Sequence, residues 1–418
     1  MSETPFPSNC DDIPQSGMLS VEQARQKILQ QLTPVTDVEV ISVRAAWGRV
    51  LSSDIVSAID VPGHDSSAMD GYAMRGVDLS ATDKTELKLI GVTHAGHPFE
   101  GKVASGECVR IMTGAAIPSG ADTVVMQELT EQTPDGVLVS PGQQLGQHVR
   151  KAGNDIQRGQ GVLKAGRRLS AADLGVIASL GQSEIKVSRR LKAAFFSTGD
   201  ELCPLGKPLQ PGQIHDSNRY SLTGLLQSAG VEMLDLGIVP DDPDRLRNTL
   251  LDAATQAVVV VTSGGVSVGE ADYIKALLDE LGRVDIWKVA MKPGKPLTFG
   301  SLKGSWFFGL PGNPVSVMVT FTQFVLPSLQ KLMGMTPVPA LQIQLPCGIA
   351  LHKQPGRVEY QRGILQQDET GRWVVLSAGT QDSGVLSSMS QANCFIVLPA
   401  SSSGAEKGDM VTVEPFLT

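Results

Sequence analysis

Residues 258–273 constrain the fold of this chain more than any other segment, and they read Val-Val-Val-Val-Thr-Ser-Gly-Gly-Val-Ser-Val-Gly-Glu-Ala-Asp-Tyr. The run 257–261 is apolar, rich in β-branched side chains and without polar alternation. That pattern is typical of a strand buried on both faces of a parallel sheet. From residue 271 apolar side chains recur at helical spacing up to Leu281, and Gly282 is the predicted end of this helix.

Three glycines lie between the predicted strand and helix: Gly264, Gly265 and Gly269. Glycine lets the backbone turn tightly and bring its N–H groups close to a ligand. A strand, a glycine turn and a helix N-terminus together predict an anion site, because N–H groups and the helix dipole converge there. The segment is neither a Walker A loop nor the dinucleotide fingerprint. A plain connection would also contain glycine, so both interpretations stay open.

Length and composition limit the class of protein. The 418 residues are enough for about two to four domains. No apolar run approaches the roughly 20 residues that a membrane span needs. The net charge of −8 argues against a sequence-independent nucleic-acid binder, so an anionic ligand would be held by local cations. Residues 1–17 lack a signal-peptide pattern and are expected to form a flexible tail.

The cysteines and histidines give little indication of a metal site. The five cysteines are widely spaced and form no Cys-x-x-Cys pair, which favours reduced thiols in a cytoplasmic protein. His94 and His97 form the only close histidine pair, and no third ligand stands near them in the sequence. We therefore do not expect zinc.

The order of predicted elements indicates several domains. An amphipathic helix is predicted over residues 20–32, with Ser20 and Gln23 as a capping box. Residues 65–161 contain short apolar runs cut by glycine and proline, which predicts a β-rich domain inserted before a helix at 170–180. From residue 191 strands alternate with helices four times, which predicts a doubly wound parallel sheet. Short strands return beyond residue 334 and predict a small β-barrel or sandwich.

Acidic residues follow three of the strands in the predicted α/β domain. Ligands of such sheets bind beyond the carboxyl ends of the strands, so Glu201, Asp241 and Asp272 are expected to converge. Converging carboxylates beside an anion site favour Mg²⁺, although solvated loop acids would give the same pattern. Asp242 stands before Pro243 and is predicted to be a helix N-cap instead. Asn313 and Pro314 repeat that arrangement.

Other loops carry further candidates. Lys288, Lys292 and Lys295 alternate with proline and glycine in an apolar stretch, where an ammonium needs a partner such as phosphate or another oxyanion. A basic surface turn is the alternative. Asp70-Gly71 on its own predicts a hairpin turn, and the loops at residues 113–114 and 150–155 are ambiguous.

Taken together, these loops resemble one family. The chain contains, in order, Ser-Ala-Met-Asp-Gly-Tyr-Ala, Arg-Ile-Met-Thr-Gly-Ala, Ser-Thr-Gly-Asp-Glu-Leu, Ser-Gly-Gly-Val-Ser-Val-Gly-Glu-Ala-Asp-Tyr, Lys-Pro-Gly-Lys-Pro and Leu-Pro-Gly-Asn-Pro-Val-Ser. This set is similar to that of the MoeA-type molybdopterin molybdenumtransferases, a group that includes the gephyrin E domain. The match begins near residue 18 and continues to the C-terminus.

The resemblance implies a homodimer of four-domain subunits. Domain I would comprise residues 18–57 and 157–186, domain II the β-rich insertion 58–156, domain III the α/β residues 187–337, and domain IV the β-barrel 338–418. The implied reaction inserts molybdate into adenylylated molybdopterin and releases AMP with Mg²⁺. Molybdopterin adenylyltransferase and molybdoenzyme acceptors would be transient partners. The alternatives are an adenylyltransferase and a non-enzymatic scaffold like gephyrin.

The resemblance also implies roles for individual residues in a cleft between domains III and IV of one subunit and domain II of the other. Its implied catalytic residues are Asp70, Asp241, Asp272, Lys288 and Lys292. The implied substrate-binding residues are Thr113, Arg150, Asp155, Glu201, Ser263, Gly264, Gly265, Pro311, Pro314 and Ser383. Glu201, Asp241 and Asp272 would surround Mg²⁺. One departure is Asn154, where family members often have glutamate.

Overall fold

The structure is a computed structural model that describes residues 17–264, 277–336 and 338–416. The chain divides into two compact units. The first comprises the described residues of Met1–Glu39, Gly48–Val50 and Ser188–Thr418, and the second comprises Val40–Trp47 and Leu51–Val187. The N-terminal helix therefore groups with the α/β part, whereas the sequence grouped it with residues 157–186. The four-domain division itself stays a prediction.

A six-stranded sheet forms the centre of the first unit, in the order β16-β13-β17-β21-β20-β18. Its strands are β16 (Glu232–Val239), β13 (Lys192–Thr198), β17 (Val259–Ser263), β21 (Ser305–Leu310), β20 (Pro296–Leu302) and β18 (Gly282–Lys288). The first four are parallel to one another, and β20 and β18 add an antiparallel pair at one edge. The predicted parallel sheet is confirmed, and the antiparallel pair was not predicted.

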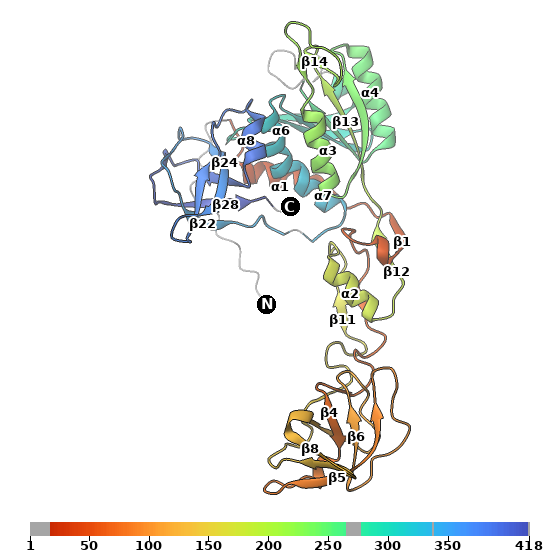
Figure 1. Cartoon of the computed structure of the whole chain (residues 1–418). Coiled ribbons are helices and arrows are strands. Elements are labelled where there is room, and N and C mark those ends of the chain that lie inside the picture. The colour runs from red at the N-terminus through yellow and green to blue at the C-terminus, as the bar shows by residue number, and fades with distance from the viewer. Residues whose placement is uncertain (1–16, 265–276, 337, 417–418) are drawn as a thin grey trace. The chain divides into compact units, whose positions relative to one another are not determined.

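Helices cover both faces of this sheet, as a doubly wound fold requires. Along β13 the side chains alternate between two cores, with Ala193 and Phe195 in one and Ala194 and Phe196 in the other. The first core also takes buried residues from α1 (Val21–Gln31), α3 (Asn218–Ser228), α6 (Pro314–Thr320), the π-helix η4 (Phe321–Val325) and α7 (Leu326–Leu332). The second takes them from α4 (Pro243–Gln256), and Figure 1 shows α3 and α4 flanking β13.

The predicted helix starts and ends are mostly confirmed. Ser20 and Gln23 form the capping box of α1. The Asp242 carboxylate accepts a hydrogen bond from the Arg245 N–H at 2.8 Å and caps α4. Of the helix predicted to end at Gly282, residues 277–281 are described and helical, and Gly282 is the first residue of β18. Among the described residues no helix is long and apolar enough to cross a membrane.

The C-terminal part of the first unit is the predicted small β-structure. Its main sheet has the order β19-β24-β26-β28-β22, and β25 pairs with β24. The strands are β19 (Met291–Lys292), β24 (Val358–Gln367), β26 (Cys394–Leu398), β28 (Met410–Pro415), β22 (Ile343–Pro346) and β25 (Trp373–Ser377). A short pair, β23 (Leu351–His352) and β27 (Gly404–Ala405), and helix α8 (Leu386–Gln391) complete it. Strand β19 comes from the lysine-rich segment and joins the α/β part to this sheet.

The second unit contains the predicted β-rich insertion, a six-stranded sheet in the order β7-β4-β6-β5-β9-β8. Its strands are β7 (Thr123–Met126), β4 (Gly71–Met74), β6 (Glu107–Ile111), β5 (Thr85–Thr93), β9 (Gly136–Val139) and β8 (Thr130–Thr133). Short pairs surround it: β10 (Val149–Arg150) with β3 (Ser66–Ser67), and β11 (Gly161–Leu163) with β2 (Ile55–Val56). Helix α2 (Ala171–Ser179) follows, and β12 (Glu184–Ser188) pairs with β1 (Val38–Ser42).

Candidate functional site

The carboxyl ends of the parallel strands are level with one another. Thr198 pairs with Val239, Ser197 with Ser263, and Ser263 with Leu310. The loops that follow β13, β16, β17 and β21 therefore leave the sheet along one edge, where open α/β sheets bind their ligands. This arrangement was predicted from the strand and loop pattern alone.

The glycine turn after β17 is closely packed where it is described. Gly264 has φ +91°, and a Cβ atom there would lie 2.5 Å from the Thr198 carbonyl oxygen. Both observations explain why a glycine stands at this position. The Gly264 N–H donates to the Leu310 carbonyl at 3.2 Å, which ties the turn to β21. Gly265 and Asp272 lie outside the described residues.

Asn218, the first residue of α3, links two of these loops. Its Nδ2 donates to the Ser263 Oγ and to the Gly312 carbonyl oxygen, both at 2.7 Å. The Ser263 hydroxyl in turn donates to the Pro311 carbonyl at 3.4 Å. Three sequence-distant segments are thus joined through one amide. In the sequence, Asn218 is marked only as a polar residue at a predicted helix start.

Several buried polar atoms at this edge have no partner among the described residues. They include Ser197 Oγ, Thr198 Oγ1 and Asp216 Oδ2. Ser197 is 1%, Thr198 5% and Asp216 3% exposed. Buried polar groups are normally hydrogen-bonded, so unpartnered ones gathered near strand ends favour a site that is completed by a ligand.

The acidic residues at the edge lie on separate loops. Glu201 is exposed after β13, with its carboxylate folded back against Gly199, and Asp241 is half-buried after β16. Within residues 17–264, 277–336 and 338–416, no three His, Cys, Asp or Glu side chains gather as a metal site. Asp272, the third expected acid, lies outside the described residues. Mg²⁺ is commonly held by one or two carboxylates with waters and substrate phosphate, and a Mg²⁺ site at this edge stays a prediction.

Lys288 reaches the same edge of the sheet. Strands β18 and β21 are both antiparallel to β20, so they run in the same direction. Lys288 is the last residue of β18 and pairs with Pro296 at the start of β20. Two residues further along β20, Thr298 pairs with Gly309 near the end of β21. The lysine is exposed and stands level with the end of β21.

Lys292 has a partner that the sequence did not predict. Its Nζ lies 3.0 Å from the Glu359 Oε1 in the neighbouring sheet. A buried carboxylate therefore supplies a partner of the kind that an ammonium in this apolar stretch was expected to need. A role in oxyanion binding stays a prediction, and it now has to include Glu359.

The Leu-Pro-Gly-Asn-Pro loop connects to the C-terminal part of the unit. Pro314 is the first residue of α6, as predicted. Asn313 occupies the N-cap position without a side-chain cap bond; its Nδ2 donates to the Ser383 Oγ at 2.9 Å. The Val315 N–H donates to the Ser383 carbonyl at 3.2 Å. Ser383 is thus held beside Pro314, and Pro311 is buried at the start of the loop.

In the second unit Asp70 and Thr113 form a compact pair. The Thr113 N–H and its hydroxyl both donate to Asp70 Oδ1 at 2.7 Å. These two hydrogen bonds, the backbone one first, lower the pKa of the exposed Asp70 carboxyl from its usual value. The carboxylate is therefore presented to solvent in its charged form.

Arg150 is the last residue of β10, and Asp155 follows it in the next loop. Arg150 is exposed and pairs with Ser66 across β10 and β3, while the Gly114 N–H donates to the Ser67 carbonyl at 2.9 Å. Strand β3 therefore lies between the segments of Arg150 and Thr113. Asp155 is exposed, and its N–H donates to the Val61 carbonyl at 3.0 Å.

Sequence reasoning missed Arg362, which is only 1% exposed. Its guanidinium donates to the carbonyls of Thr380 and Asp382, both at 2.9 Å, and to the Ser388 Oγ at 3.0 Å. The acceptors come from the segment before Ser383 and from helix α8 after it. Local sequence gives no signal for such partners, because they lie outside the strand that carries the arginine.

Models of protein families match most of the chain. The MoeA N-terminal region (domains I and II) matches residues 19–181, a probable molybdopterin binding domain matches 194–331, and the MoeA C-terminal region (domain IV) matches 344–416.

Whole-chain relatives agree with these models. A molybdopterin molybdenumtransferase of Haemophilus influenzae is 44% identical over 96% of this chain and 99% of its own length. Another of Nostoc sp. is 38% identical over 92% of this chain and 90% of its own. The crystal structure of a molybdopterin biosynthesis moeA protein from Pyrococcus horikoshii superposes with a TM-score of 0.83 at 28% identity, covering 96% of this chain and 100% of the other. The chain therefore belongs to the MoeA family of molybdopterin molybdenumtransferases.

Proposed function

We propose that this chain is an enzyme of molybdenum cofactor biosynthesis that inserts molybdenum into molybdopterin. The carrying observation is the shared carboxyl edge of the α/β sheet. The strand ends at this edge carry the Gly264 turn and Lys288, and Asn218 joins two of the neighbouring loops by hydrogen bonds. Relatives that share nearly the whole chain are named molybdopterin molybdenumtransferases.

The substrates would be adenylylated molybdopterin and molybdate. Both are anionic, and the chain as a whole carries a net charge of −8, so binding has to come from local donors. The Gly264 turn and the unpartnered hydroxyls of Ser197 and Thr198 would receive the phosphate or pterin part. Lys288 and Lys292 would attract molybdate oxygens, since ammonium groups act as compact positive charges.

Mg²⁺ would be held by Glu201, Asp241 and Asp272, and when bound it would neutralise charge on the phosphates. The protein's own residues would then mainly position the substrates. Lys288 and Lys292 would hold the oxyanion, and the loops joined by Asn218 would orient the phosphate-bearing part. Exchange of oxygen for dithiolene sulfur depends chiefly on such alignment.

We further propose a homodimer in which Asp70, Thr113, Arg150 and Asp155 of one subunit complete the cleft of the other. The Asp70 carboxylate supports this, because it is exposed to solvent, is charged and is held in place by two hydrogen bonds from Thr113. The four described cysteines are free thiols, which suits a cytoplasmic protein. Molybdopterin adenylyltransferase and molybdoenzyme acceptors would be its transient partners.

An AMP-release assay tests the function. Purified protein is supplied with adenylylated molybdopterin and Mg²⁺, with and without molybdate, and we expect AMP release and active cofactor only with molybdate. The same protein given molybdopterin and Mg-ATP should form no adenylylated product. Product formation in that second reaction, with no molybdate effect in the first, would identify an adenylyltransferase. No reaction in either would favour the scaffold.

A further inference from the structure

Strand β24 buries polar side chains that the proposed mechanism does not yet use. Glu359 is 4% exposed, Gln361 3% and Arg362 1%. Charged groups are rarely buried this deeply unless they are paired, because removal from water is costly. Each therefore calls for a partner, and that of Glu359 lies in the lysine-rich segment.

Glu359 and Lys292 form an asymmetric pair. The Glu359 Oε1 lies 3.0 Å from the Lys292 Nζ, with 5% of the glutamate side chain and 46% of the lysine side chain exposed. The Gln361 Nε2 donates to the same oxygen at 3.4 Å. The carboxylate is thus fixed inside the protein, while the ammonium stands at the surface with donors left for another oxygen.

Strand β24, which carries Glu359, also fixes the backbone of Lys292. Lys292 pairs with Glu359 and Met291 with Val358 where β19 meets β24. The Val358 N–H also donates to the Ala290 carbonyl at 3.0 Å. Strand β24 therefore holds both the main chain and the side-chain end of Lys292.

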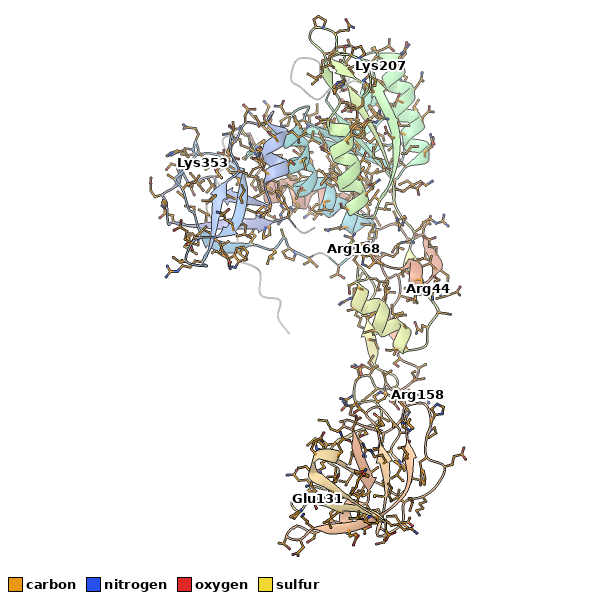
Figure 2. All side chains as sticks on the ribbon, viewed as in Figure 1. Arg44, Glu131, Arg158, Arg168, Lys207 and Lys353 are labelled. Carbon is orange, nitrogen blue, oxygen red and sulfur yellow. The ribbon has the colours of Figure 1, made fainter. Side chains whose placement is uncertain are left out.

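Two buried cations, Lys353 and Arg362, lie near enough to Glu359 to feel its charge, but their hydrogen bonds go to other groups. Lys353, labelled in Figure 2, is 8% exposed, and its Nζ donates to the carbonyls of Pro399 and Ser402 at 2.8 and 2.7 Å. Those carbonyls satisfy Lys353, so the direct ionic contact of Glu359 is with Lys292.

We propose that Glu359 is a positioning residue that holds the Lys292 ammonium in place for an oxyanion substrate. A lysine stem is long and flexible, and ordering it costs much of what one contact gains. A buried carboxylate orders it in advance. This inference rests on the proposed function, in which Lys292 meets molybdate.

The test is Glu359→Gln, assayed for molybdate-dependent AMP release. Glutamine keeps the shape and an acceptor for Gln361 but loses the charged contact. We expect the KM for molybdate to rise about tenfold, the size of one lost charge-assisted hydrogen bond, with kcat little changed. A lower KM would mean that Glu359 only neutralises the lysine, and a changed melting temperature with unchanged KM would mean a purely structural tie. Either result overturns the proposal.

Glu414→Gln is the matched control. Glu414 is another buried carboxylate of the same sheet, 8% exposed, and it accepts bonds from the amides of Gln323 and Gln342 at 3.3 and 2.8 Å. The Glu414→Gln substitution should leave the KM for molybdate unchanged. In a Lys292→Gln background, Glu359→Gln should add no further increase, and an additive increase would contradict the proposal.

Two safeguards separate the possible failures. If Glu359→Gln does not fold, Glu359→Asp keeps the charge and withdraws it by one methylene, and the same rise in KM is expected. If the wild type shows no molybdate-dependent AMP release, the proposed function fails. If the wild type is active and the folded Glu359 variants keep its KM, only the positioning role fails.

Discussion

The sheet edge of the first unit and the Asp70 turn of the second present polar groups in different ways. At the sheet edge, loops from separate elements are joined by side-chain bonds, such as those from Asn218 to Ser263 and to Gly312. In the second unit, Asp70 is held by Thr113 at the end of the adjacent strand β6. The first arrangement joins a helix and loops from separate elements, whereas the second joins the ends of two neighbouring strands of one sheet.

This difference has consequences for mutations. The effects of substitutions at the sheet edge are expected to extend to neighbouring loops, because a supporting side chain such as Asn218 holds more than one loop in place. Substitutions at Asp70 are expected to stay local, because an isosteric side chain can keep the Thr113 bonds. Four predictions test this contrast.

The largest effect is expected from Asp70→Asn. Asparagine Oδ1 can still accept both Thr113 bonds, so the melting temperature should stay near that of the wild type while AMP release falls by about 100-fold or more. Asp65→Asn is the control, since Asp65 forms an ion pair with Lys151 at 2.8 Å in the same unit. A nearly silent Asp70→Asn would show that Asp70 serves only the turn, for which asparagine is equally suited.

Arg362→Met should destabilise the first unit by about 3 kcal/mol, because it removes the hydrogen bonds of a buried guanidinium to Thr380, Asp382 and Ser388. Urea unfolding followed by a probe in the C-terminal β-structure measures this. The exposed Arg372→Met in the same β-structure should change stability by less than about 0.5 kcal/mol. Equal effects of the two variants would contradict the role given to Arg362.

Asn218→Ala removes the donor shared by Ser263 and Gly312. We expect kcat/KM to drop about tenfold, in line with the loss of one or two hydrogen bonds that orient loops. Asn248→Ala, at an exposed position on α4, should have no effect on kinetics. If the two alanine variants have the same kcat/KM, the sheet-edge loops do not depend on the Asn218 hydrogen bonds.

The smallest effect concerns the Asp70 pKa. Its folded-state value is lowered by the Thr113 bonds, so this carboxylate stabilises the fold above the unfolded pKa of about 3.9, and the contribution disappears as pH falls through the folded pKa. Thr113→Val removes the hydroxyl donor but keeps the N–H, so the Asp70 pKa should rise part of the way toward its usual value. NMR titration of the carboxyl measures this. The Asp368 pKa, lowered by Thr370 in the other unit, should not move.

Much of the fold could be predicted because its signals are local. The unalternated apolar run gave β17, and Asp242 before Pro243 gave the start of α4. The antiparallel pair β18 and β20 was missed because the lysines, prolines and glycine between them indicated a loop.

The positions of site residues could be predicted only where the order of strands along the chain determines them. Strand ends place Ser263, Gly264 and Lys288 at one edge, because register follows from the sheet. The partners of buried polar groups do not follow from local sequence. Glu359 meets Lys292 across 67 residues and Asn218 meets Gly312 across 94. Such pairs depend on tertiary packing.

The most direct test of a site shared between two subunits is a mixing experiment. Asp70→Asn and Asp241→Asn subunits, each inactive alone, are given different affinity tags, and the heterodimer is purified through both. If Asp70 of one subunit completes the cleft that contains Asp241 of the other, one site carries both lesions and the other carries none, so AMP release returns in the heterodimer. If both residues act within one subunit, every site keeps a lesion. No recovery in a verified heterodimer would contradict the shared site.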